Sequence, residues 1–369
     1  MASIRRHPEA LHRWQVRYRD PSGRQRTKNF AKKSDAEKHA AIVEADKVRG
    51  QWSDPQLART SFGSWWTQYC GSKVHLSAST RARTESLGRN MILPTFGTVE
   101  LGSIQPVLIR RWISELMERR YAPATVRKAY QLFGAAIRAA VEEGLIVRSP
   151  LRGISLPRQA QTAVRFLTAE EVSLLAEAID PRYRALVFTA AYSGLRLGEL
   201  TGLRVTDIDL LRRKLHVDQT LTEVSGELRF KEPKTRGSRR TVNLPKAVIG
   251  ILAEHIAAYP STSGLVFTAI QGGPIRQTNF RRRHWQPAVR ASIGGQCRFH
   301  DLRHTHAALM ISQGEHPKVI QSRLGHASIS TTLDTYGHLF EGLDEAAADR
   351  LNAVFEGVRV DNMWTETGA

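Results

Sequence analysis

The sequence predicts an α+β protein of several domains: a small N-terminal β-sheet with one helix, an all-helical middle part, and a mainly helical last part with a small antiparallel sheet. Three observations support this fold class. Residues 13–19 alternate strictly between apolar and polar side chains, residues 60–155 place apolar side chains at helical spacing, and residues 166–345 change from helical to strand-like patterns and back. A chain of 369 residues is long enough for two or three domains, each with its own core.

The chain is strongly basic. It has 54 Lys and Arg against 35 Asp and Glu, a formal charge of +19, and the first 50 residues hold 13 basic against 6 acidic side chains, which is +7 of that total. An excess of this size on a folded chain indicates a polyanionic partner, most often nucleic acid. The alternative is a generally basic soluble protein.

Cysteine usage and hydropathy exclude several classes of protein. Cys70 and Cys297 are far apart, and there is no CxxC or Cys/His zinc spacing, which indicates a reducing compartment and argues against a disulfide-stapled secreted domain. The first thirty residues lack the apolar core of a signal peptide, and no stretch approaches the length of a membrane span. We therefore expect a cytoplasmic protein with no membrane contact.

The first predicted domain covers residues 1–58 and contains a sheet of two or three strands. Trp14, Val16 and Tyr18 point to one face, and a turn at residues 20–23 leads into a second alternating strand. A helix of about residues 35–49 follows, with Ser34 and Glu37 as its capping box.

The other face of this sheet is predicted to be almost purely basic. Because a β-ribbon fits the major groove, we expect four of its side chains to contact DNA. They are Arg17, Arg19, Arg26 and Lys28. The alternative is an ordinary solvated sheet face.

Residues 59–155 are predicted to be an all-helical domain. Four segments show apolar positions at helical spacing, namely FGSWWTQYC, TRARTESLGRNMIL, VLIRRWISELMER and TVRKAYQLFGAAIRAAVEEG. The last segment has an apolar stripe and ends at Gly144. Residues 156–165 have no periodic pattern and are interpreted as a linker.

The last domain is predicted over residues 166–345, with a tail helix in 346–369. Thr168 and Glu171 form a capping box at its start. The segments LHVDQTLTEV, GELRFKE and RRTVNLP are strand-like, and KTRGS is interpreted as a tight turn between the last two. Further helices are expected near 247–258, 303–313, 316–324 and 329–339. The tail places Leu343, Ala347, Leu351 and Val354 or Phe355 on one face.

Six polar residues in this last domain form a set suited to phosphodiester chemistry. They are Arg196, Lys234, His300, Arg303, His326 and Tyr336. A guanidinium matches two phosphate oxygens, and a second one stabilises charge that grows in a pentacoordinate transition state. A phenol with nearby positive charge can attack the phosphorus. Glu199 lies three residues after Arg196 and could orient it, although Arg-x-x-Glu alone is more often a structural ion pair.

The other residues of the set are considered next, and for Lys234 the sequence leaves another residue open for the same role. Lys234, at the predicted hairpin turn, could protonate a leaving oxygen, with Lys231 as the main rival for that role. Basic neighbours there are interpreted as phosphate contacts or solvated charges; they are Lys231, Arg236, Arg239 and Arg240. His326 follows a C-terminal cap at Gly325. Tyr336 is expected on a short helix whose Ile329 or Leu333 faces inward and which presents the phenol.

The motifs argue against a metal or nucleotide requirement. His304 and His306 invite a zinc interpretation, but no carboxylate or cysteine pattern accompanies them, and neither a two-metal carboxylate cluster nor a GxxxxGK[ST] loop occurs in these motifs. We therefore expect no cofactor, with covalent catalysis by Tyr336.

The segments SGLRLGEL, HDLRHTHA and LGH, with Tyr336 ten residues after His326, resemble a tyrosine recombinase of the phage integrase family with an N-terminal arm-type DNA-binding domain. The resemblance implies that Tyr336 forms a 3′-phosphotyrosine bond, that Arg196 and Arg303 hold the phosphate, and that Lys234 protonates the leaving 5′-oxygen. It also implies that His300 assists proton transfer and that His326 contacts a non-bridging oxygen. Residues 59–155 would be the core-binding domain and 166–345 the catalytic domain.

The resemblance further implies a metal- and ATP-independent integrase that acts on double-stranded DNA as a homotetramer through a Holliday junction. Its tail helix would dock on a neighbouring protomer, and a directionality factor and a host DNA-bending protein would assist it. Alternatives are a Xer-like resolvase, a transposase of an integrative conjugative element and a relaxing topoisomerase; the basic N-terminal sheet argues against the resolvase and the topoisomerase. A non-catalytic DNA-binding protein is disfavoured by the complete set of six residues.

Overall fold

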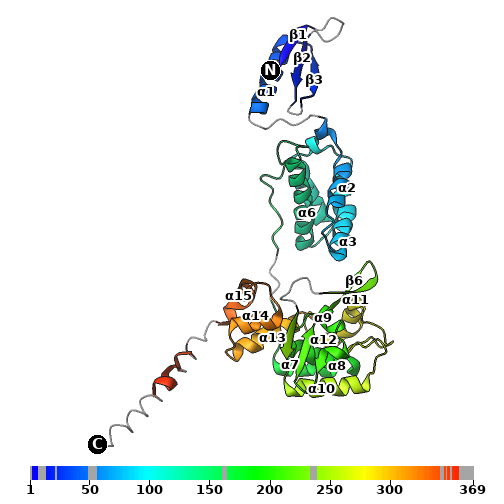
Figure 1. Cartoon of the computed structure of the whole chain (residues 1–369), viewed down its shortest axis with the longest axis vertical. Coiled ribbons are helices and arrows are strands. Elements are labelled where there is room, and N and C mark those ends of the chain that lie inside the picture. The colour runs from blue at the N-terminus through cyan, green and yellow to red at the C-terminus, as the bar shows by residue number, and fades with distance from the viewer. Residues whose placement is uncertain are drawn as a thin grey trace, which may run out of the picture. The chain divides into compact units, whose positions relative to one another are not determined.

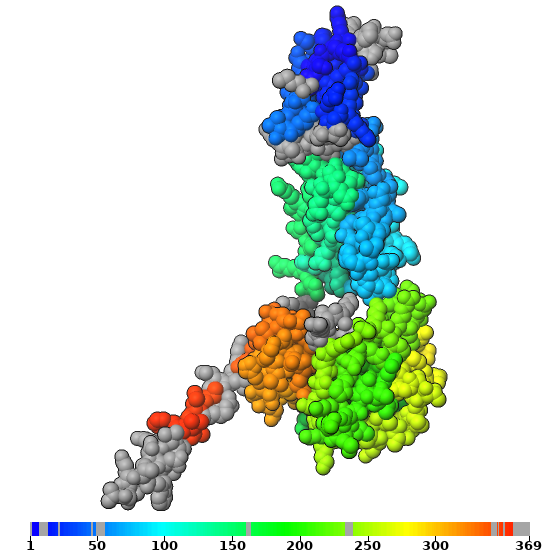
Figure 2. All heavy atoms as spheres, viewed as in Figure 1, coloured from blue at the N-terminus to red at the C-terminus, as the bar shows by residue number. Residues whose placement is uncertain are grey.

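The computed structural model describes residues 2–6, 14–20, 23–48, 56–159, 164–232, 239–340, 345, 347–349 and 351–356. The chain divides into two compact units, residues 1–161 and 162–369, which are drawn in Figures 1 and 2. The mixed α+β class predicted from the sequence is confirmed. In the described residues, no helix combines the length and the apolar character needed to cross a membrane.

The N-terminal sheet has three antiparallel strands in the order β1-β2-β3. These are β1 (Ser3–Arg6), β2 (Trp14–Arg19) and β3 (Gln25–Phe30), and α1 (Lys33–Val48) packs on one face of the sheet (Figure 1). Val16 and Tyr18 are buried against α1. The helix begins one residue before Ser34, so Ser34 lies in its first turn and not at its N-cap.

The register of this sheet corrects the prediction that four basic residues share one face. Tyr18 pairs with Arg26 and Val16 pairs with Lys28, and directly paired residues point to the same side of a sheet. Arg26 and Lys28 therefore lie on the side that α1 covers. The single alternation pattern of β3 could not show which of its two sets of side chains faces the helix.

Arg17 and Arg19 keep their predicted place on the open face. Ser3 pairs with Arg17, and Arg5 pairs with Gln15, so Arg5 joins the two arginines there. The open face, defined as Arg5, Arg17 and Arg19 together with the polar side chains between them, is hollowed next to Ser3 and Gln25.

The helical part of the first unit contains the four predicted helices. They are α2 (Phe62–Ser72), α3 (Ala78–Leu87), α5 (Pro106–Glu118) and α6 (Pro123–Glu142), joined by short turns at η1 (Leu57–Arg59), η2 (Gly88–Ile92), α4 (Leu93–Phe96) and η3 (Leu101–Ser103). Their core is aromatic: the rings of Phe96 and Phe133 stack with centroids 4.4 Å apart, and Trp112 lies 5.5 Å from Phe133. The indole nitrogen of Trp112 donates to the Met91 carbonyl, so burial of the ring leaves no donor unpaired.

The second unit opens with three helices. They are α7 (Ala169–Ala178), α8 (Pro181–Ser193) and the short α9 (Leu197–Thr201). The capping box of Thr168 and Glu171 predicted at the start of α7 is confirmed. Gly194 ends α8 in the left-handed conformation with φ of +70°, and this turn directs the chain into α9.

Strands and further helices follow. The remaining elements are η4 (Val205–Asp207), β4 (Ile208–Asp209), β5 (Lys214–Val217), β6 (Thr220–Val224), β7 (Glu227–Lys231), β8 (Arg240–Asn243), α10 (Lys246–Ala258), α11 (Gln277–Phe280), η6 (Arg281–Trp285), α12 (Gln286–Ser292), α13 (Asp301–Ser312), α14 (Pro317–Leu324), α15 (Ile329–Tyr336) and η7 (Gly337–Phe340). In Figure 2, α13–α15 form the orange lobe beside the green lobe, and α13 packs on α8.

The strand pairing differs from the predicted hairpin. β7 pairs with β6 through a turn at Ser225 and Gly226, whereas β8 pairs with β5. The strands on either side of KTRGS are therefore not partners of each other. Residues 233–238, which include Lys234 and Arg236, lie outside the described residues.

The described part of the tail is helical. Residues 345, 347–349 and 351–356 have helical backbone, and Leu351 and Val354 are exposed. Leu343 lies outside the described residues, so the predicted apolar face of the tail is described only in part. Docking of the tail on a neighbouring protomer stays a prediction.

Replacing Gly194 by Ala tests how tightly α8 is joined to the α13–α15 lobe. The new Cβ would lie 2.6 Å from His306 Cδ2 and 2.8 Å from Leu324 Cδ2. We expect a loss of about 1–2 kcal/mol from the left-handed backbone and about 1–3 kcal/mol more from crowding, measured by denaturant unfolding.

Gly264→Ala is the matched control. Gly264 also has φ of +70°, but nothing lies within 4 Å of its added Cβ. The difference between the two variants isolates the crowding, and equal changes in stability would contradict a tight fit at Gly194.

Candidate active site

Arg196 stands at the N-cap of α9, immediately after the turn at Gly194 and Leu195. Its backbone N–H donates to Glu199 Oε2 at 2.9 Å, and its side-chain Nη1 donates to Glu199 Oε1 at 3.0 Å. The guanidinium is 42% exposed. One edge of the group is therefore held by a carboxylate while the rest remains accessible to a ligand.

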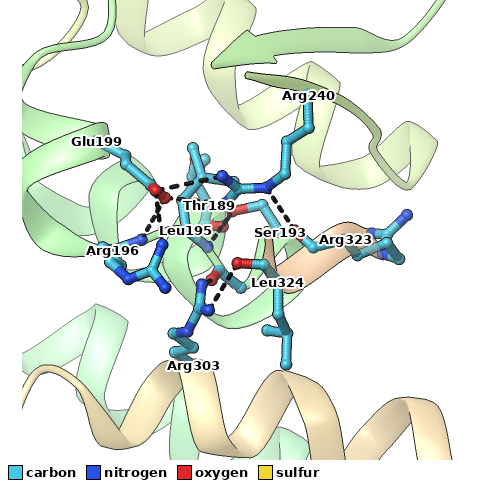
Figure 3. Close-up of polar contacts among 10 residues, drawn as sticks. Thr189, Ser193, Leu195, Arg196, Glu199, Arg240, Arg303, Arg323 and Leu324 are labelled. Carbon is cyan, nitrogen blue, oxygen red and sulfur yellow. Dashed lines mark hydrogen bonds and ion pairs between the residues drawn. The ribbon is translucent and has the colours of Figure 1, made fainter. Parts of the chain in front are cut away.

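Glu199 is buried and is shared between two arginines (Figure 3). Arg240, at the start of β8, donates from Nη2 to Glu199 Oε2 at 2.9 Å and from Nη1 to Oε1 at 3.2 Å. Burial alone would raise the pKa of this carboxyl group. The hydrogen bonds and charges of Arg240 and Arg196 outweigh burial and hold the pKa below its usual value.

Arg240 is a structural residue, which corrects its interpretation as a DNA contact. Its side chain is 7% exposed, and its Nε donates to the Arg323 carbonyl at the end of α14 at 2.6 Å. It therefore ties β8 to both α9 and α14 (Figure 3). Sequence reasoning counted it among a cluster of surface cations, because buried partners that are distant in the chain leave no local signal.

Arg303 lies in the first turn of α13 and is almost fully buried. Its Nη1 donates to the Gly194 carbonyl and its Nη2 to the Leu324 carbonyl, both at 2.6 Å. Burial and the charges of Arg196 and Arg240 lower its pKa to about 9, so the group still carries its charge at neutral pH. Neutral carbonyls orient this cation without cancelling it.

The two histidines of the predicted catalytic set, His300 and His326, flank these arginines. His300 precedes α13, and partial desolvation together with His304, Arg303 and Arg196 lowers its pKa to about 4, although the side chain still reaches solvent. His326 follows Gly325, whose left-handed conformation confirms the predicted C-terminal cap of α14.

His326 is held by the helix that carries the tyrosine. Its Nδ1 lies 2.9 Å from the Thr332 hydroxyl oxygen. Burial, followed by the charges of Arg303, Arg196 and Arg240, lowers its pKa to about 4. Both flanking imidazoles are therefore neutral at pH 7 when the site holds no anion.

Tyr336 is the last residue of α15 and is 1% exposed. The predicted orientation of this helix was wrong: Ile329 and Leu333 are partly exposed, and Thr332 and Tyr336 face inward. The polar side chains can point inward because His326 and His304 provide hydrogen-bond partners for them.

Tyr336 is close to the predicted site residues. Burial raises the pKa of its phenol, and Arg303 and Arg196 oppose that rise. The structure therefore brings five of the six predicted residues into one electrostatically coupled cluster, which is Arg196, His300, Arg303, His326 and Tyr336. Lys234 lies outside the described residues.

The other basic residues predicted near Lys234 are only partly described. Lys231 is half-buried at the end of β7. Arg239 is exposed and pairs with Glu232 at 2.7 Å. Arg236 lies outside the described residues, so its predicted phosphate contact stays a prediction.

Two family models match the chain. Residues 165–342 match the phage integrase family, and residues 61–117 match the phage integrase N-terminal SAM-like domain. The integrase of Mycobacterium phage FRAT1 is 30% identical over 260 residues, which are 69% of this chain and 77% of that protein. The chain belongs to the phage integrase family. As a member it is a site-specific recombinase of the tyrosine type.

Another relative and two solved structures match a larger part of the chain. A putative prophage phiRv2 integrase of Mycobacterium tuberculosis is 29% identical over 366 residues, 93% of each chain. The Tn1549 transposon integrase bound to a circular intermediate DNA has a TM-score of 0.70 at 19% identity, over 79% of this chain and 99% of that one. A lambda integrase tetramer bound to a Holliday junction has a TM-score of 0.57 at 20% identity, over 86% and 91%. These structures share the fold.

Sequence reasoning about this integrase missed two features of the site. The first is His304, which it weighed only as a metal ligand and which contacts the Tyr336 hydroxyl. The second is a cavity of about 490 Å³ beside Arg196 and His300, lined also by Gln277, Arg281 and Arg298. The spacing of His304 from His300, one helical turn, was the signal that could have placed both rings on one side of the start of α13.

Glu199→Ala tests the shared carboxylate. The substitution leaves the Arg240 guanidinium buried without its anion, and we expect a loss of about 3–5 kcal/mol in the free energy of unfolding. Glu227→Ala removes the exposed pair with Arg229, whose side chains are 69% and 52% exposed, and should cost at most about 1 kcal/mol. Similar changes in the two variants would contradict the role given to Glu199.

The Glu199 effect should also depend on pH. Because the folded pKa is below the ordinary carboxyl value of 4.5, the stabilisation is fully present above that value. It is lost as the pH falls through the lower folded pKa. The difference between the wild-type chain and Glu199→Ala should therefore shrink in acid.

Proposed function

We propose that this protein integrates and excises a phage, prophage or integrative element by cutting and rejoining DNA strands through a 3′-phosphotyrosine intermediate. The observation that supports the proposal best is the cluster of Arg196, His300, Arg303, His326 and Tyr336. These residues come from the start of α9, the start of α13, the α14–α15 turn and the end of α15. A tyrosine beside two arginines and two neutral imidazoles is suited to phosphodiester transfer.

Arg196 and Arg303 would hold the scissile phosphate. Both guanidinium groups are oriented before DNA arrives, Arg196 by Glu199 and Arg303 by two backbone carbonyls. Donors fixed in place stabilise the charge of the transition state without a cost of reorganisation at the moment of reaction.

His326 would donate a hydrogen bond to a non-bridging oxygen, and His300 would assist proton transfer. Their lowered pKa values make both rings neutral in the free protein. A bound phosphate would oppose the neighbouring positive charges and raise those values. Lys234 would protonate the leaving 5′-oxygen, with Lys231 as the rival for that role.

Assembly would follow the pattern of the structures that share the fold. One of them is a lambda integrase tetramer on a Holliday junction, which supports a homotetramer that exchanges strands on duplex DNA. We infer that the protein works in the bacterial cytoplasm at the nucleoid, assisted by a directionality factor and a host DNA-bending protein. The tail helix would dock on a neighbouring protomer.

A Xer-like resolvase is the main alternative. The basic three-stranded sheet before the helical part favours an integrase, because it offers a second DNA contact for arm-type sites. The match to a prophage integrase over 93% of both chains also supports an integrase. The open face would then supply phosphate contacts through Arg5, Arg17 and Arg19.

Tyr336→Phe tests the reaction. The substrate is a nicked duplex made from the repeated core sequence at the two ends of the element, which traps the cleaved strand on the protein. We expect the wild-type chain to give a covalent protein–DNA band. The variant should give none while it binds the duplex as before, because only the nucleophilic oxygen is removed. A covalent band that the Tyr336→Phe variant still forms would contradict the proposal.

Two double substitutions test the open face. Arg17→Ala with Arg19→Ala should lower the slope of log K against log salt for DNA binding by about 0.9 for each phosphate that the protein no longer neutralises. Arg26→Ala with Lys28→Ala removes the same charge from the side that faces α1 and should change the slope less. Equal changes in the two variants would argue against a face-specific contact.

A further inference from the structure

The proposed chemistry needs a group that takes the proton of the Tyr336 hydroxyl. An ordinary phenol has a pKa near 10, and burial raises that of Tyr336 further. The positive charges of Arg303 and Arg196 oppose the rise but do not reverse it. A neutral phenol is a weak nucleophile, so its proton has to leave as the oxygen attacks.

His304 is in hydrogen-bond contact with that hydroxyl. Its Nδ1 lies 2.9 Å from Tyr336 Oη, and the two rings meet edge to face with centroids 5.7 Å apart. A general base must lie within about 2.6–3.2 Å of the atom whose proton it takes. His304 meets that condition in the free protein.

The surroundings of His304 fit the same role. Its ring is half-buried and touches the His300 ring, with centroids 5.0 Å apart and planes at 87°. Burial lowers the pKa of His304, Asp301 raises it, and Arg298 and Arg303 lower it further. The imidazole is therefore neutral at pH 7 and can accept a proton, and His300 links it to the solvent-exposed edge of the site.

We propose that His304 is the catalytic base of strand cleavage, taking the hydroxyl proton of Tyr336 on Nδ1 as the phenol oxygen attacks the scissile phosphorus. This inference rests on the proposed function and assigns a residue that the six-residue set does not contain. His300, the residue first expected to assist proton transfer, would then act next in line, through contact with the His304 ring.

The step balances without any added reactant. The phenol O–H bond breaks and its proton moves to Nδ1, while the oxygen electron pair forms the bond to phosphorus. The bond from phosphorus to the 5′-oxygen breaks, and that oxygen takes a proton from the general acid. In the rejoining step the incoming 5′-hydroxyl gives its proton back to the general acid and attacks the phosphotyrosine, and His304 returns its proton to the Tyr336 oxygen as it leaves.

The test separates the base from the acid with a modified DNA. In the nicked duplex, sulfur replaces the bridging 5′-oxygen, so the leaving thiolate needs no proton and the lysine acid becomes dispensable. His304→Asn is the decisive variant, because the Asn oxygen can occupy the place of Nδ1 and accept the same hydrogen bond but cannot take the proton. We expect covalent adduct formation to slow about 10²–10⁴-fold, with DNA binding and the unfolding midpoint unchanged.

A second measurement guards against a structural explanation. Incorporation of 3,5-difluorotyrosine at position 336 supplies a phenol that ionises near neutral pH without a base. The fluorinated residue should restore most of the cleavage rate that His304→Asn loses. Each protein is compared with its own unfluorinated form, so a variant that folds less well still gives a valid comparison. A merely structural contact would leave the loss unrelieved.

The possible results distinguish the assignment of His304 from the proposed reaction itself. Cleavage by His304→Asn within about twofold of wild type, or a loss that difluorotyrosine leaves in place, would overturn the assignment of His304. Either result with an inactive Tyr336→Phe would leave the proposed recombinase reaction standing. An adduct formed by Tyr336→Phe would instead remove the reaction itself.

Discussion

The carboxylate of Glu199 is the group on which the rest of the site depends. It is buried, and it accepts hydrogen bonds from Arg196 on one side and Arg240 on the other. Through the Arg240 bond to the Arg323 carbonyl, the same cluster reaches the end of α14, directly before the turn that carries His326. One anion thereby joins α9, β8 and α14, and a buried charge of this kind is tolerated only because both of its oxygens are paired (Figure 3).

Arg196 and Arg303, the two arginines proposed to hold the phosphate, are held in different ways, and the difference matters for the charge of the site. Arg196 shares its carboxylate with a second cation, so Glu199 does not neutralise it fully. Arg303 is held by the carbonyls of Gly194 and Leu324, which orient the group and leave its charge intact. Because Gly194 has no Cβ, the side chains of His306 and Leu324 can lie close to its backbone. Positive charge therefore remains around Arg196 and Arg303, where it acts on the neighbouring groups.

That positive charge has consequences for the neighbouring groups. It lowers the pKa of His300 and His326 to about 4 and works against the raised pKa of the Tyr336 phenol. The imidazoles are consequently donors or acceptors and not cations until an anion arrives. The contact between Tyr336 and His304 satisfies the buried hydroxyl and also explains why α15 turns its polar side chains inward. The same hydrogen bond thus stabilises the packing of α15 and holds His304 against the Tyr336 hydroxyl.

The sequence by itself determined the chemical inventory of this protein. Helical periodicity located α2, α3, α5 and α6, because such patterns depend on neighbours one turn away. The motifs around Arg196, His300, Arg303, His326 and Tyr336 indicated phosphodiester chemistry, and their resemblance to the phage integrase family implied the reaction. Periodicity did not find α11, η6 and α12, where a run of three arginines in a π-helical turn and a proline hide the apolar face.

Only the tertiary structure decided that Arg26 and Lys28 face α1, that Arg240 is buried, that β8 pairs with β5, and that His304 contacts the tyrosine. Each of these depends on a partner far away in the chain, and a single sequence carries no record of which distant residue completes a pair.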